Sequence, residues 1–207
     1  HSYQYYEYVS TSTTGKRYAC HSPPSATFTV TGSGSKNPTY HTEYKLTIQA
    51  SGEGTTSPSP GSYWHDAGSS VSVQAIPNSE AYKLDHWSID GSNIGSTNPI
   101  TVTMNNPHTL NAIFTTKTIT LTVKVLKYDS SIGISGVTVK IDGSSYTTDS
   151  NGKVQVEIGV GSHKVEIVTP FYPSSDTRYL FTGWSDGSWV NPRTFTVKDP
   201  QTVTAYM

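Results

Sequence analysis

One stretch of this chain occurs twice, at residues 82–114 and, in shortened form, at residues 179–207. The copies read YKLDHWSIDGSNIGSTNPITVTMNNPHTLNAIF and YLFTGWSDGSWVNPRTFTVKDPQTVTAYM. Both contain a tryptophan in an aromatic-rich segment, an Asp-Gly pair, an Asn-Pro pair and two runs of alternating apolar residues. Internal repetition constrains an architecture more than any local pattern does. The residues that recur are therefore interpreted as scaffold, and function is sought where the copies differ.

Apolar residues outside the repeat also alternate with polar ones. Examples are Leu46, Ile48 and Ala50, then Val71, Val73 and Ala75, and then Val154, Val156 and Ile158. A period of two is that of a half-buried strand, and no helical period accompanies it. The sequence predicts an all-β fold of two small β-sandwich-like modules in tandem, without substantial helix.

The expected domains follow from these patterns. Residues 1–43 form a Tyr/Ser/Thr-rich arm and edge strand, residues 44–116 a first β module, and residues 117–207 a β-sandwich that the second copy of the repeat closes. The start of the chain has two interpretations. It is either an edge strand of the first module or an extended arm that adds to the sheet of a neighbouring molecule.

Composition limits the partners. Charged residues make up 14 % of the chain and the formal net charge is -1, so no basic field attracts nucleic acid or an anionic membrane. No apolar run reaches the roughly 20 residues of a membrane span. Low charge with abundant Ser, Thr and Tyr favours an extracellular or cell-surface location. The single cysteine, Cys20, cannot form an internal disulfide.

Residues 44–115 resemble a known family. The segments GSSVSVQAIP, YKLDHWSIDG, NPITVTM and PHTLNAIF are similar to the divergent InlB B-repeat, also called the bacterial repeat domain, and residues 179–207 resemble its second half. The resemblance implies a small all-β module of bacterial or archaeal surface proteins. Such modules act mostly as spacers, stalks and interaction modules, and not as catalysts.

The region between the copies resembles a second family. The run GVTVKIDGSSYTTDSNGKVQVEI, within residues 118–169, is similar to carboxypeptidase-regulatory-like or Cna-B-like β-sandwiches. Some Cna-B-like domains carry a Lys–Asn isopeptide cross-link. Lys124 and Glu157 match two of its components, but residues 163–168 contain no asparagine, so the cross-link is not predicted.

No motif indicates chemistry. The seven histidines show no metal-binding spacing with one another or with Cys20, and no G-x-S-x-G elbow is present. Asp90 and Asp186 occupy matching turns, which suggests local Asx-turn roles. No catalytic residue, metal site or cofactor is predicted, and the chain is expected not to be an enzyme.

Aromatic residues are the candidate binding residues. Trp87 and Trp184 match in the repeat and are predicted to lie in the core. Trp64 and Trp189, with Tyr63 beside the former, are candidates for a platform that stacks on a sugar ring. In the N-terminal segment, Tyr3, Tyr5 and Tyr8 are candidates for an assembly arm.

Two functions from different classes are consistent with these observations. The leading hypothesis is a non-catalytic structural and interaction module of a cell-surface or filament-forming protein, which acts by spacing, adhesion or self-association through β-sheet edges. The alternative is an accessory domain of a larger secreted hydrolase, which binds a glycan or another substrate through its exposed tryptophans.

Overall fold

The computed structural model describes residues 8–20 and 39–207. These residues form strands, turns and bends without a helix, which confirms the predicted all-β fold. The chain divides into two compact units, His1–Thr115 and Thr116–Met207. Each unit contains its own apolar core.

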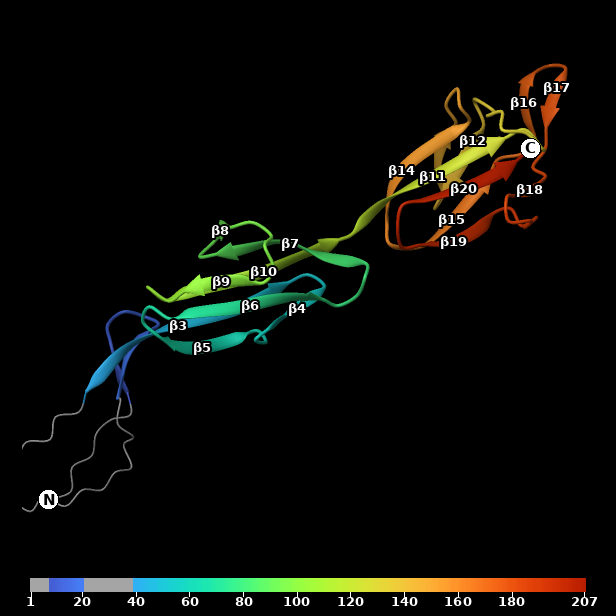
Figure 1. Ribbon diagram of the computed structural model, residues 1–207. Coiled ribbons are helices and arrows are strands. Elements are labelled where there is room, and N and C mark those ends of the chain that lie inside the picture. The colour runs from blue at the N-terminus through green and yellow to red at the C-terminus, as the bar shows by residue number, and fades with distance from the viewer. Residues whose placement is uncertain (1–7, 21–38) are drawn as a thin grey trace, which may run out of the picture. The chain divides into compact units, whose positions relative to one another are not determined.

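Unit 1 contains a large sheet and a small one (Figure 1). The large sheet consists of β1 (Tyr8–Ser10), β2 (Lys16–Cys20), β3 (Tyr40–Ser51), β10 (His108–Thr116), β7 (Tyr82–Ile89) and β8 (Ser92–Asn93) in that spatial order, and β5 (Gly61–Asp66) also pairs with β3. The small sheet consists of β4 (Gly54–Ser57), β6 (Ser70–Pro77) and β9 (Ile100–Thr103). Strands β3 and β10 run parallel to each other.

The long strand β3 has three partners. Strand β2 pairs with its first part, Tyr40 to Tyr44, and β10 pairs with it from Leu46 onward. Strand β5 overlaps both of these stretches, between Glu43 and Ile48. It must therefore lie along the opposite edge of β3. The β1–β2 hairpin thus extends the sheet beyond the start of β10.

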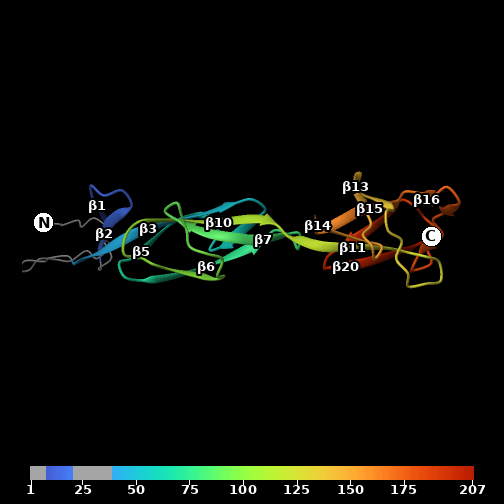
Figure 2. The same ribbon diagram turned by 90° about the horizontal axis from the view of Figure 1, so that it is seen from above.

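Unit 2 is a sandwich of two four-stranded sheets (Figure 2). One consists of β14 (Lys153–Gly159), β11 (Thr118–Leu126), β20 (Gln201–Tyr206) and β18 (Gly183–Trp184). The other consists of β13 (Ser144–Thr147), β12 (Thr138–Ile141), β15 (Gly161–Ile167) and β19 (Arg193–Val197). A separate hairpin pairs β16 (Phe171–Ser174) with β17 (Thr177–Tyr179).

The two units share a common topology. Each has a central parallel pair, β3 with β10 and β11 with β20. An antiparallel strand flanks each pair, β5 in unit 1 and β14 in unit 2. In the opposite sheets, β6 pairs with β9 as β15 pairs with β19. The structural repeat therefore extends to most of each unit, well beyond the stretch that is visible in the sequence.

The matched tryptophans lie in the two cores, as predicted. Trp87 is 0 % exposed and Trp184 is 3 % exposed. Each indole nitrogen donates a hydrogen bond to a loop carbonyl, Trp87 to Thr97 at 3.1 Å and Trp184 to Val190 at 2.8 Å. A buried indole requires an acceptor for its N–H. Each ring therefore packs in the core and also fixes the loop that follows its strand.

The matched asparagines replace a missing stretch of strand pairing. The Asn98 side chain accepts a hydrogen bond from the Ala75 N–H at 2.8 Å and donates one to the Ala75 carbonyl at 2.9 Å. Asn191 makes the same two bonds with Ile167, at 2.9 and 2.8 Å. A buried backbone group that lacks a partner is costly. The carboxamide satisfies both groups, which explains why the Asn-Pro pair recurs.

One of the two matched Asp-Gly turns, at Asp90, differs from the expected local role. The hydrogen bonds of the Asp90 carboxylate go to the neighbouring strand β10 and not to its own turn. The carboxylate accepts from the Thr109 N–H at 2.8 Å and contacts the His108 ring nitrogen at 2.6 Å. Its chemical counterpart is Asp142, which contacts the Lys164 N–H and the His163 ring at the same distances. Partial burial raises the pKa of both carboxyls, but these hydrogen bonds outweigh it and hold each pKa below its usual value.

Asp186, which matches Asp90 in the sequence, does have a local role. Its carboxylate accepts a bond from the Ser188 N–H two residues on, at 3.2 Å, as an Asx-turn requires. Arg193 also donates to it at 2.6 Å. The Arg193 hydrogen bond is the main reason that the pKa of Asp186 is lowered.

Candidate functional site

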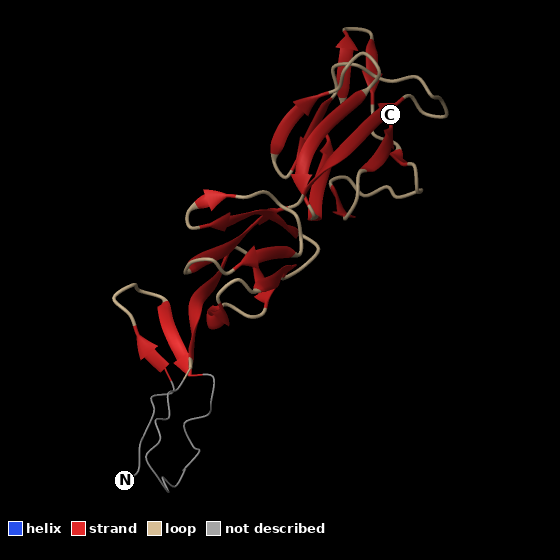
Figure 3. Cartoon of the chain, turned by 60° about the vertical axis from the view of Figure 1, so that its left-hand side comes forward, coloured by secondary structure: helices blue, strands red, loops and turns tan. Residues whose placement is uncertain are grey.

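The β1–β2 hairpin is where unit 1 departs most clearly from the shared topology. Among the described residues, no strand of unit 2 occupies the corresponding place beside the start of β11. Figure 3 shows the hairpin as two adjacent strands joined by a loop. A cleft of about 320 Å³ adjoins it and is lined by Tyr8, Ser10, Thr11, Thr13, Thr14, Gly15, Lys16, Arg17 and Trp64.

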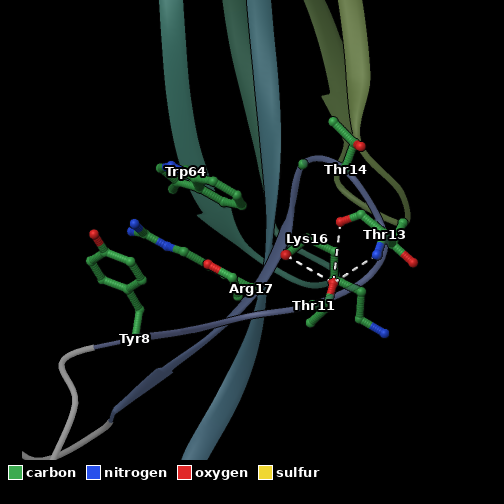
Figure 4. A pocket seen from close by; sticks show the side chains of 9 residues that line it. Tyr8, Thr11, Thr13, Thr14, Lys16, Arg17 and Trp64 are labelled. Atoms are coloured by element: carbon green, nitrogen blue, oxygen red, sulfur yellow. Dashed lines mark hydrogen bonds between the residues drawn. The ribbon is translucent and has the colours of Figure 1, made fainter.

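Arg17 is the central side chain of this cleft. Its guanidinium lies between two rings (Figure 4), 4.9 Å from the Tyr8 centroid and 4.4 Å from the Trp64 centroid. Its Nε donates to Glu43 Oε2 at 2.5 Å. Cation–π contacts and an ion pair reinforce one another when all the groups are partly desolvated. Two rings and a carboxylate therefore hold this cation in place.

Strand register brings these residues together. Arg17 lies directly opposite Glu43, and Trp64 lies opposite Lys45, two residues along β3 from Glu43. Tyr8 lies opposite Ala19, two residues from Arg17 on β2. Residues that are directly opposite, or two positions apart on a strand, share one face of a sheet. The four side chains therefore project from the same face.

The turn of the hairpin is fixed by its own hydrogen bonds. The Thr11 hydroxyl donates to the carbonyls of Thr13 and Lys16, at 3.1 and 3.0 Å. Gly15 has a φ of 80°, and a Cβ added there would lie 2.8 Å from the Pro107 side chain. The turn thus requires glycine both for its backbone conformation and for its close contact with the loop before β10.

The predicted sugar platform is not a single surface. Tyr63 and Trp64 are adjacent on β5, so they point to opposite faces of the sheet. The Tyr63 ring packs against the core of unit 1, and its hydroxyl donates to the Ser59 carbonyl at 2.7 Å. Arg17 covers one face of the Trp64 ring. Tyr63 and Trp64 therefore cannot stack together on one ligand.

Trp189 and the N-terminal tyrosines are the remaining candidate binding residues. Trp189 is 82 % exposed, in the loop between β18 and β19. Tyr8 lies in β1 and is half-exposed, whereas Tyr3 and Tyr5 lie outside the described residues. The sequence did not single out Arg17 or Glu43. Alternation in YHTEYKL could have placed His41 and Glu43 on one face, but their partner strands are set by long-range register.

The cleft has the chemistry of a binding surface. Hydroxyl groups of Ser10, Thr11, Thr13 and Thr14 and the cations Lys16 and Arg17 line it, beside the two aromatic rings. Such groups recognise polar and anionic partners. In the described part of the chain, no helix is long and apolar enough to cross a membrane.

Comparison with solved structures gives several similar folds at low identity. The Bacillus anthracis TIE protein matches 93 % of this chain at 11 % identity and a TM-score of 0.43, and the chain spans only 41 % of that protein. A C-terminal fragment of the pilus adhesin SpaC from Lactobacillus rhamnosus GG matches 79 % of this chain and 95 % of its own length, at 15 % identity and a TM-score of 0.37. The major pilin subunit BcpA of Bacillus cereus matches 93 % of this chain and 84 % of its own length, at 12 % identity and a TM-score of 0.38.

Comparison with curated proteins gives no match. The family comparison does give one, over residues 44–118, to the divergent InlB B-repeat domain. This range agrees with the residues that carry the resemblance in the sequence. It covers β3 from Tyr44 onward and every later strand through to the end of β10. The divergent InlB B-repeat domain is therefore the family whose model residues 44–118 match.

Proposed function

We propose that this chain is a non-catalytic structural and interaction module of an extracellular or cell-surface protein, and that it self-associates through the edge of the unit 1 sheet. The observation that carries the proposal is strand β1. Within the described residues, β1 is the terminal strand of the large sheet. Its side chains are exposed, with Tyr8 at 50 % and Val9 at 42 %, and Tyr18 on the neighbouring strand is 39 % exposed.

An edge strand of this kind favours pairing with another chain. Edge strands present backbone N–H and C=O groups that a neighbouring strand can satisfy. Proteins usually block such edges with charge, but β1 reads Tyr-Val-Ser and has none. Exposed aromatic and β-branched side chains add apolar area to the backbone bonds. Pairing of β1 with a strand of a second molecule would bury both its backbone polar groups and its exposed side chains.

The remaining features support a structural role. The residues that recur in the two units lie in the cores and in loop contacts. Such positions indicate that these residues stabilise the fold. The InlB B-repeat family resembled here consists mostly of spacers and interaction modules. Low charge and abundant Ser and Thr favour an extracellular location. These observations support assembly over catalysis.

Substitution at the β1 edge tests the proposal. Val9→Lys places a charge on the exposed edge, and it is expected to abolish concentration-dependent light scattering and any polymers that are visible by electron microscopy. The matched control is Ile76→Lys on β6, because Ile76 is 40 % exposed and also lies in a strand. Ile76→Lys is expected to associate like the unmodified chain.

Two results would contradict the proposed assembly. One is an unmodified chain that remains monomeric as its concentration rises. The other is association that Val9→Lys and Ile76→Lys weaken to the same extent, because this would indicate nonspecific apolar contacts.

A second function is favoured by one observation, the exposed ring of Trp189. Its loop is held by two hydrogen bonds. The backbone N–H of Trp184 donates to the Ser188 carbonyl at 2.8 Å, and the Arg193 side chain donates to Asp186. An exposed ring on a fixed loop can stack on a sugar without a large loss of conformational entropy. We therefore propose glycan binding at Trp189 as the alternative function.

Pull-down on insoluble polysaccharide tests the alternative. Trp189→Ala is expected to weaken retention by about tenfold, which corresponds to about 1.4 kcal/mol. Trp64→Ala is the control, because Arg17 covers one face of that ring, and it is expected to retain binding. The alternative is wrong if the unmodified chain is not retained, or if Trp64→Ala alone loses binding.

A further inference from the structure

We propose that unit 1 contains a zinc-binding site formed by His41 Nε2, Glu43 Oε1 and Asp66 Oδ1. His41 and Glu43 lie on β3, and Asp66 ends β5. One possible ligand atom of each residue lies within 4.8 Å of those of the other two. None of the three ligands lies in strand β1 or in the loop of Trp189.

The separations suit a tetrahedral ion. His41 Nε2 lies 2.8 Å from Asp66 Oδ1 and 3.8 Å from Glu43 Oε1. Zinc bonds of about 2.0–2.1 Å at tetrahedral angles place neighbouring donors about 3.4 Å apart. The observed distances lie on either side of this value. Small shifts of the three side chains would therefore make room for the ion. The ion would replace the proton in the hydrogen bond between His41 and Asp66.

The strand register places the donors in this arrangement. His41 and Glu43 are two residues apart on β3 and therefore point to the same face. Glu43 and Asp66 are directly opposite each other in the antiparallel β3–β5 pair. Two carboxylates at opposed positions repel each other. A divalent cation between them would convert this repulsion into attraction.

Arg17 prepares Glu43 for this role. Its Nε contacts Oε2 of the carboxylate at 2.5 Å, whereas His41 Nε2 lies nearest Oε1, at 3.8 Å. A carboxylate that binds a metal through one oxygen is usually held by a hydrogen bond to the other. The Tyr8 and Trp64 rings hold Arg17 in turn. The cleft described above therefore positions one of the proposed ligands.

The donor set identifies the class of metal. Calcium and magnesium prefer sites made only of oxygen. One imidazole nitrogen with two carboxylate oxygens is a combination that zinc accepts, and three protein ligands leave a fourth position for water or another donor. The Asp66 side chain is 68 % exposed and that of His41 is 38 % exposed. The ion would therefore have an open path from solvent.

The cluster is not part of the shared scaffold. Ile48 pairs with Leu110 as Val123 pairs with Val203, and Leu110 and Val203 match in the repeat. Thr116 and Thr118 precede Val123 by as many residues as His41 and Glu43 precede Ile48. They are therefore the unit 2 counterparts of His41 and Glu43. Thr118 pairs with Gly159, which replaces Asp66. Unit 2 thus has no ligand at any of the three positions, so the fold itself does not require these residues.

Calorimetric titration of the full 207-residue chain with Zn²⁺ tests the site. The unmodified chain is expected to bind one equivalent and to melt at a higher temperature in its presence, because a ligand that binds only the folded state stabilises it. His41→Ala and Asp66→Asn are each expected to weaken this binding by about a hundredfold or more, beyond the effect of losing an outer-shell partner. Ca²⁺ is expected to give no comparable binding.

His86→Ala is the matched control. His86 also contacts a carboxylate, Asp85, at 2.7 Å, but its pair is not part of the three-donor cluster. It is expected to bind Zn²⁺ like the unmodified chain. Absence of Zn²⁺ binding to the unmodified chain would overturn the proposal. So would a His41→Ala variant that folds, as judged by circular dichroism, and binds Zn²⁺ with unchanged affinity.

Discussion

Replacement of Trp87 or Trp184 by alanine is expected to lower the free energy of unfolding of the unit that carries it by about 3–5 kcal/mol. Both rings are buried, at 0 % and 3 % exposure. Alanine would leave a cavity and would also leave the carbonyls of Thr97 or Val190 without their indole donor. Trp184→Ala would also remove the edge-to-face contacts of the indole ring with Phe181 and Phe195.

Urea unfolding followed by the NMR resonances of each unit measures this effect, because one transition midpoint is not well defined for a two-unit chain. Trp189→Ala is the matched control. Its ring is 82 % exposed, and a surface substitution of this kind changes stability by only about 0.5 kcal/mol or less. Equal losses for Trp184→Ala and Trp189→Ala would show that the repeat tryptophan is not a core residue.

Replacement of Asn98 or Asn191 by alanine is expected to be the next most damaging change. Each carboxamide bonds both the N–H and the carbonyl of one residue on the neighbouring strand, Ala75 or Ile167. Loss of a partner costs about 1–3 kcal/mol for each buried group left unsatisfied. Two groups are affected at each site, so the loss is expected to exceed that of an ordinary surface substitution.

Aspartate at the same positions separates the two bonds. Asn98→Asp keeps an oxygen that can accept from the Ala75 N–H, but it replaces the donor to the Ala75 carbonyl with a second acceptor. The stability of Asn98→Asp is expected to fall and its Ala75 amide to stay more protected from hydrogen exchange than in Asn98→Ala. An Asn98→Ala variant as stable as the unmodified chain would show that the pairing is dispensable.

Much of the fold could be predicted from the sequence, because its signals are local. Alternation in Val71, Val73 and Ala75 indicated a strand whose three side chains face the core. The matched tryptophans indicated core positions because the same ring recurs in both copies of the repeat. The shared topology of the two units is less visible in the sequence, because only the second half of each unit retains recognisable sequence similarity.

The site was harder to predict because it depends on pairing between distant strands. Arg17, Glu43 and Asp66 adjoin one another only through the registers of β2, β3 and β5. Matching Asp90 with Asp186 by sequence missed that Asp90 bonds a histidine across the sheet as Asp142 does. The Tyr63–Trp64 pair failed as a platform for a simpler reason, since adjacent strand residues face opposite ways.

Amide hydrogen exchange at low and high protein concentration tests whether the cores are scaffold and the β1 edge makes the contact. The outward-facing amides of Tyr8–Ser10 are expected to gain protection as concentration rises. The amides of Ala75 and Ile167, which bond to side chains inside their own units, are expected to stay equally protected throughout. Exchange in β1 that does not change with concentration, in a chain that nevertheless associates, would show that association uses another surface.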